Sequence, residues 1–178
     1  MIYPWVDSAN KIFRIVVIVQ WLISLFIAFF TSSWTEPFLL GLPILALPII
    51  LSYTHASKPI SRYAFAIAVQ LFAALHIQQA YGMTELHFEI FVMLAFLSYF
   101  RYWKTIAVAS ATVAVHHVLF YFVQSGGGAL LIFEEGRVSL HTLAIHAAFA
   151  VAEGVLLGIM ARSSFNEASG ALILNKIV

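Results

Sequence analysis

The sequence predicts an all-α integral membrane protein with six transmembrane helices, of which helices three to six form the core bundle. Three observations predict this class. Of the 178 residues, 62% are hydrophobic and only 10% are charged, which is too apolar for a soluble domain of this size. The apolar residues fall into six stretches separated by turns. The basic residues lie almost entirely in alternate turns, as they do in multi-pass membrane proteins.

Each apolar stretch is interpreted as one membrane crossing. Residues 1–14 precede the first stretch and suit the membrane interface, and Pro43 and Pro48 are expected to kink the second. We divide the chain into a six-helix transmembrane domain over residues 1–162 and a cytoplasmic exit helix over residues 163–178. The six stretches cover residues 15–30, 38–53, 63–81, 86–100, 105–122 and 140–160.

Polar and small residues are concentrated in stretches three to six, which is why these are expected to form the core, with one and two peripheral. Ala66 and Ala73 share a face of stretch three, and Gly154 and Gly158 lie in stretch six. Small side chains let membrane helices approach one another closely.

The orientation of the chain follows from its basic residues, since cytoplasmic loops of membrane proteins are enriched in Lys and Arg. Only Arg137 lies on the opposite side from the others. Both ends of the chain are therefore expected in the cytoplasm. The eight residues on the cytoplasmic side are Lys11, Arg14, Lys58, Arg62, Arg101, Lys104, Arg162 and Lys176.

Composition excludes several kinds of partner. The net charge of +1 argues against a nucleic acid. The absence of cysteine rules out disulfides and thiolate metal sites, so any bound metal would use imidazole, carboxylate or thioether ligands. The N-terminal residues lack the pattern of a cleaved signal peptide, so we expect them to be retained.

Six of the seven histidines fall in one layer near the outer ends of stretches three to six. At about 1.5 Å per residue, His76, His117 and His146 lie roughly 8–9 Å below the outer boundary. Ionisable residues inside a membrane are costly and usually functional. The layer consists of His76, His87, His116, His117, His141 and His146, whereas His55 lies on the other side.

A bound transition metal is the favoured interpretation of this layer, because imidazole suits copper, zinc, iron and nickel. We expect ligands from His76, from His117 or His116, and from His146, with His87 and His141 as further ligands. Adjacent histidines on a helix point about 100° apart, so one of the pair is expected in the main site.

Several alternatives remain for the bound ligand and for the role of the histidines. Copper is favoured over zinc because the site faces outside and Met83 and Met93 lie near, and haem b is the alternative because two histidines suffice to hold it. Glu153 is expected to hydrogen-bond a ligating histidine from the second shell. A proton-sensing cluster and a purely structural network are further interpretations of the histidines.

The run ELHFEIFV, the turn RYW, the motif AVHHVLF and the spacing from His146 to Glu153 resemble a bacterial family of membrane-embedded sensory input regions. Such regions precede methyl-accepting chemotaxis and diguanylate cyclase output modules. Family members commonly carry Asp where this chain has Tyr102. The resemblance implies a sensor rather than an enzyme, placed in the bacterial inner membrane.

The expected function is therefore sensing through the histidine layer, with transmission through helix six into the cytoplasm. The expected partners are the lipid bilayer, a cytoplasmic output domain and a second copy in a homodimer. A b-type haem electron-transfer protein and a metal transporter are the alternatives. The transporter needs polar residues along an inward path, and the sequence offers few: Gln70, Ser98 and Glu153.

Overall fold

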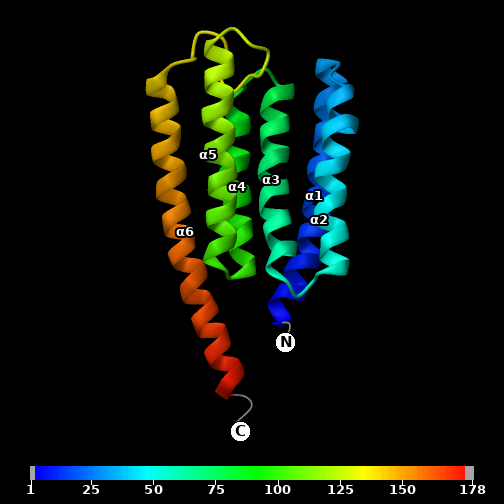
Figure 1. The fold of residues 1–178 in the computed structure, drawn as a ribbon, viewed down its shortest axis with the longest axis vertical. Coiled ribbons are helices and arrows are strands. Elements are labelled where there is room, and N and C mark those ends of the chain that lie inside the picture. The colour runs from blue at the N-terminus through cyan, green and yellow to red at the C-terminus, as the bar shows by residue number, and fades with distance from the viewer. Residues whose placement is uncertain (1–2, 175–178) are drawn as a thin grey trace.

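The computed structural model describes residues 3–174, which form six α-helices and contain no strand. The helices run up and down beside one another as an elongated bundle (Figure 1). A π-helical turn, Pro37–Gly41, precedes α2, and 3-10 turns, Thr84–His87 and Ser98–Phe100, flank α4. The helices are α1 Pro4–Thr31, α2 Leu42–Thr54, α3 Pro59–Gln79, α4 Phe88–Leu97, α5 Trp103–Ser125 and α6 Leu140–Leu174.

Five of these helical segments are long and apolar enough to cross a membrane: α1, the π-helical turn with α2, α3, α5 and α6. The ten-residue α4 does not qualify by itself. Large apolar side chains such as Phe29, Phe122 and Phe149 are exposed on the outside of the bundle. A soluble protein rarely tolerates so much exposed apolar surface, so the chain has the character of a multi-pass membrane protein.

The first helix begins earlier than the sequence predicted. Residues 1–14 were expected as an interfacial lead, but α1 starts at Pro4. Proline is favoured at the first position of a helix because its fixed φ suits the helix and its missing N–H has no partner there anyway. Asp7 lies in the first turn, where a negative charge complements the helix dipole, and pairs with Lys11 at 2.8 Å.

The centre of the bundle is α3. In its most apolar stretch 72% of residues are buried, against 6% for α6. α3 packs against α1, α2 and α5, and α1 contributes Phe13 and Val17 to the core beside Phe65 and Phe72 of α3. A core made of helices three to six is therefore not confirmed, because α1 is part of the core and α6 lies at the edge (Figure 1).

The two ends of the bundle differ. α1 begins at the same end as the α2–α3 and α4–α5 connections (Figure 1), and we call this the inner end. All the basic residues expected on the cytoplasmic side fall there, apart from Lys176, which lies outside the described residues. The opposite, outer end carries the long α5–α6 loop with Arg137.

α6 extends beyond the inner end of the bundle as one uninterrupted helix (Figure 1). It is buried only at Ala161. Four residues further on, Phe165 packs against three aromatic rings, those of Tyr3 at 5.6 Å, Trp5 at 5.9 Å and Tyr102 at 5.0 Å between centroids. These contacts attach α6 to the start of the chain and to the α4–α5 turn.

Candidate metal site at the outer end

Three histidine rings from three separate elements meet near the outer end of the bundle. His87 ends the 3-10 turn before α4, His117 lies in α5 and His146 lies in α6. We call these residues the three-histidine cluster. They are far apart in the sequence, so the packing of α4, α5 and α6 brings them together.

One of the three ring spacings in the cluster matches that expected for a shared ion. The ring centroids are 5.1 Å apart for His87 and His146, 5.7 Å for His87 and His117, and 6.3 Å for His117 and His146. A metal–nitrogen bond of about 2.0–2.1 Å places each ring centre roughly 3.2 Å from the ion. Two rings at a tetrahedral angle then have centres about 5 Å apart, close to the shortest of these distances.

Each ring of the cluster is oriented by the same kind of hydrogen bond. Nδ1 donates to the carbonyl oxygen four residues earlier, at 3.1 Å in His87, 3.0 Å in His117 and 2.8 Å in His146. A carbonyl oxygen only accepts, so Nδ1 carries the proton and Nε2 keeps its lone pair. This is the tautomer that binds a metal through Nε2, and such a bond to the other ring nitrogen is typical of metal-ligating histidines.

The cluster is sheltered from the outside. His87 and His117 are 3% and 7% exposed, and Nε2 of His87 is buried with no hydrogen-bond partner within residues 3–174. A buried polar atom without a partner is costly. A ligand for His87 would remove that cost.

The α5–α6 loop covers the cluster with Phe133. Its ring stacks on His87 at 5.9 Å with an interplanar angle of 11°, and lies 5.1 Å from His146. Gln124 holds the loop by accepting from the backbone N–H groups of Ile132 and Phe133 and donating to the Phe133 carbonyl at 2.6 Å. A Cβ at Gly82 would clash with the Phe133 backbone, so glycine is required there.

Space is available beside the cluster. A cavity of about 270 Å³ lies between α5 and α6 and is lined by His117 and His146 among apolar residues. Within residues 3–174, no group of three His, Asp or Glu side chains is arranged so that it could hold a metal ion. The three ring centres are therefore gathered without a metal-binding arrangement of their nitrogens.

The remaining predicted ligands lie elsewhere. His116 has its ring 5.1 Å from that of His117, yet it lines a different groove on the opposite side of α5. His141 is exposed near the start of α6. His55 lies at the inner end, where its Nδ1 is 2.9 Å from the Thr54 hydroxyl.

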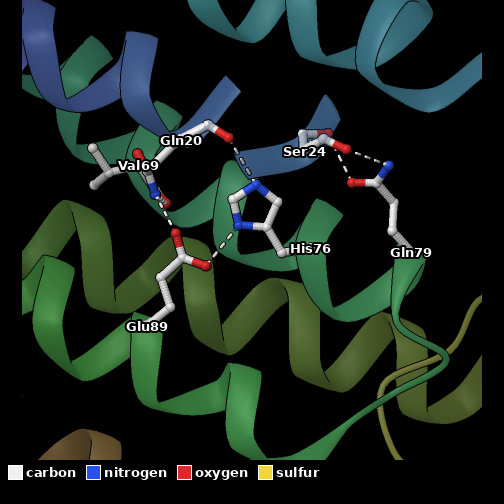
Figure 2. A network of polar contacts seen from close by, with 6 residues as sticks. All are labelled: Gln20, Ser24, Val69, His76, Gln79 and Glu89. Atoms are coloured by element: carbon white, nitrogen blue, oxygen red, sulfur yellow. Dashed lines mark hydrogen bonds and ion pairs between the residues drawn. The ribbon is translucent and has the colours of Figure 1, made fainter. Parts of the chain in front are cut away.

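His76 is fully buried in a network of its own (Figure 2). Its Nδ1 is 2.7 Å from Oε2 of Glu89, and its Nε2 is 2.9 Å from the carbonyl oxygen of Gln20. The Gln20 side chain donates to Glu89 at 2.8 Å and to the Val69 carbonyl at 3.0 Å. Both nitrogens of His76 are therefore occupied, and the network joins α1, α3 and α4.

The carboxylate that pairs with a histidine is Glu89, and the expected partner Glu153 does not take this role. Glu153 is half-buried, and its Oε2 has no hydrogen-bond partner in the described part of the chain. His146 instead bonds the Thr142 carbonyl. Sequence reasoning missed Glu89, although its place two residues after His87 in an apolar run was a usable signal.

The fold and this cluster define a multi-pass helical membrane protein with a sheltered group of histidines at one end. Comparisons of the chain with family models, with curated proteins and with solved structures find no match. A function is therefore inferred from the residues of the cluster and from the sequence motifs.

Proposed function

We propose that the chain is a membrane-embedded sensory domain that binds a transition-metal ion through His87, His117 and His146 and reports it through α6. The observation that carries this proposal is the approach of three rings, from three elements, to within 5.1–6.3 Å of one another. The shared tautomer and the partnerless Nε2 of His87 support it. Of the adjacent residues His116 and His117, the proposed ligand is therefore His117. His87 takes the role that the sequence predicted for His76.

The proposed topology has six crossings, with both ends in the cytoplasm of a bacterial inner membrane. The sixth crossing is the continuous helical segment from Thr84 to Phe100, in which the two 3-10 turns extend α4. Its 17 residues are at the lower limit of roughly 17 for a spanning helix. An even number of crossings agrees with α1 beginning and α6 ending at the same end (Figure 1).

Copper is the proposed ion, with zinc second. Imidazole binds both, and Cu²⁺ leads the Irving–Williams order of affinity. Met83 precedes the 3-10 turn that carries His87, and its carbonyl orients that ring. Haem b fits less well, because His87 lies within 5.1 Å and 5.7 Å of the other two rings and occupies the space that a porphyrin would need. A b-type electron-transfer function is disfavoured for the same reason.

A metal transporter is also less well supported. It would need polar groups leading from the cluster to the inner end, but the cavity next to the cluster is lined mainly by apolar residues. Glu153 lies further along α6, and no hydrogen bond links it to the cluster within the described residues. A site that holds an ion without an inward path suits detection.

Transmission through α6 is proposed because this helix carries His146 and leaves the bundle at the inner end. α6 contributes little to the buried core, and it packs mainly against α5. The resemblance to sensory input regions suggests a chemotaxis or diguanylate cyclase output module at that end, within a homodimer. The proposal assigns no catalysis to the described helices.

The decisive experiment is metal analysis of the purified protein in lipid nanodiscs, with elemental analysis and an absorption spectrum. We expect one copper or zinc ion per chain and no haem Soret band. His87→Ala, His117→Ala and His146→Ala should each lower metal affinity at least about 100-fold. His55→Ala is the matched control, since it removes a histidine at the inner end, and should bind as the parent does.

Two results would overturn the metal assignment: no stoichiometric metal after loading, or equal loss of affinity in the control. Transmission of the signal through α6 has a separate test. The chain has no cysteine, so Ser57→Cys and Ala171→Cys can be spin-labelled as a pair at the inner end. Zinc addition should change the distance between the labels, and an unchanged distance in a metal-loaded protein would refute transmission through α6.

A further inference from the structure

A second, larger cavity lies on the other side of α5 and is not used by the proposed metal site. It is a groove of about 860 Å³ between the π-helical turn, α2, α3 and α5, which we call the His116 groove. Along α5 it is lined from Val108 to Phe120. Twelve residues of α-helix correspond to about 18 Å, so the groove reaches from the outer part of the bundle towards its middle.

The lining is apolar except for Gln78, Thr112 and His116. The amide of Gln78 is occupied, because it donates to the Ala129 carbonyl at 3.1 Å and accepts from the Leu131 N–H at 2.7 Å. The Thr112 hydroxyl donates to the carbonyl of its own helix at 2.9 Å. These two polar groups therefore have no need of a ligand.

His116 is different. The residue is 8% exposed, and its Nε2 has no hydrogen-bond partner within residues 3–174. Its ring packs on Phe120 with centroids 4.2 Å apart. An imidazole needs one partner for its N–H and one for its lone pair. The groove therefore has a long apolar body and one hydrogen-bonding group, beside an aromatic ring, near its outer part.

The depth of His116 narrows the choice of occupant. It lies six residues inside the outer end of the apolar stretch at Phe122, or about 9 Å along the helix. The phosphate of a phospholipid stays at the polar surface of the bilayer, outside the hydrocarbon core. A polar group that reaches His116 must therefore be one that an apolar molecule carries into the hydrocarbon, such as a carbonyl on a ring.

We propose that the His116 groove binds a lipid-soluble quinone, with a ring carbonyl hydrogen-bonded to His116. The flat head packs beside Phe120, and the apolar tail lies along Ile67 and Leu71 of α3 and Val108 of α5. The inference goes beyond the metal proposal and is independent of it. His116 lines this groove, whereas His117 lines the separate cavity beside the three-histidine cluster.

The test uses protein in nanodiscs of quinone-free phospholipid and a ubiquinone analogue with a decyl tail, detected by quenching of intrinsic tryptophan fluorescence. Trp21 is a suitable reporter, since it packs by Gly41 near the groove residue Leu75. We expect saturable quenching with one quinone per chain. His116→Leu should weaken binding about tenfold through loss of one hydrogen bond. Ala111→Phe should abolish it by filling the groove.

The matched control is Ala148→Phe, which adds the same ring to an exposed position on α6 outside the groove. Circular dichroism and gel filtration confirm folding of every variant. Equal quenching in both phenylalanine variants would mean partition into lipid and would overturn the proposal. Unchanged affinity of His116→Leu for the quinone would also overturn the proposal. The same holds if organic extracts of the purified protein contain phospholipid but no quinone.

Discussion

Nδ1 of His76 lies 2.7 Å from Oε2 of Glu89, while Nε2 of the same ring lies 2.9 Å from the Gln20 carbonyl oxygen. Because the carbonyl only accepts, Nε2 must carry a proton. A second proton lies between Nδ1 and Oε2, since two lone pairs would repel at that distance. The pair is therefore neutral as a whole, whichever atom holds the proton. Neutrality makes a carboxyl and an imidazole tolerable inside a membrane.

Replacing Glu89 tests this network. In Glu89→Gln, the new amide can donate to His76 Nδ1 and still accept from the Gln20 side chain, so stability should change little. Glu89→Leu removes the partner of His76 Nδ1 and one of the two hydrogen bonds that the Gln20 amide donates, and should cost about 1–3 kcal/mol for each. Thermal unfolding in detergent measures the difference. Equal destabilisation by both substitutions would show that the carboxyl makes a contact which the amide cannot replace.

Metal affinity should fall as the pH falls. A protonated imidazole cannot ligate, so protons and the ion compete for the nitrogens of His87, His117 and His146. Isothermal titration calorimetry at several pH values checks this. His55→Ala should give the parental slope, and His87→Ala a shallower one. A pH-independent affinity would contradict histidine ligation.

The covering loop should open when Gln124 is replaced. Gln124→Leu removes three hydrogen bonds to Ile132 and Phe133, so hydrogen exchange over residues 126–139 should accelerate, and a bound ion should leave faster. Ser125→Ala is the control, because that exposed hydroxyl bonds only within α5. If exchange is the same in both variants, Gln124 does not hold the loop.

Single cysteines can test the topology, because the chain has none of its own. Glu135→Cys, in the α5–α6 loop, should react with a membrane-impermeant maleimide in intact cells. Ser57→Cys, in the α2–α3 connection, should react only after permeabilisation. Both positions are exposed. The reverse pattern would invert the orientation, and labelling of both in intact cells would contradict the spanning arrangement.

The all-helical fold could be predicted from the sequence because apolar length and turn residues are local properties. The depths of the histidines were predicted in the same way, from the rise of a helix. The depth of a residue does not say which side of the helix its side chain is on. His76 and His117 have similar depths, yet His76 faces Glu89 and Gln20 while His117 faces His146. That choice depends on which helices are neighbours.

The role of α1 was missed for a related reason. Its polar residues Gln20 and Ser24 are buried and bond Glu89 and Gln79, but in the sequence they are two isolated residues in an apolar run. A single buried amide has no spacing pattern to reveal it. Small-residue content therefore pointed to helices three to six, whereas hydrogen bonds between α1 and α3 help to fix the centre of the bundle.

In the proposed transmission through α6, the contacts of Phe165 with Tyr3, Trp5 and Tyr102 are the point about which the helix would pivot. His146 lies 19 residues before Phe165 and Leu174 nine residues after it, lever arms of about 28 Å and 13 Å. A rigid helix that pivots at Phe165 moves its two ends in opposite directions, and its inner end travels about half as far as its outer end. Under that proposal, a displacement of α6 at His146 would be about halved at the inner end of the helix.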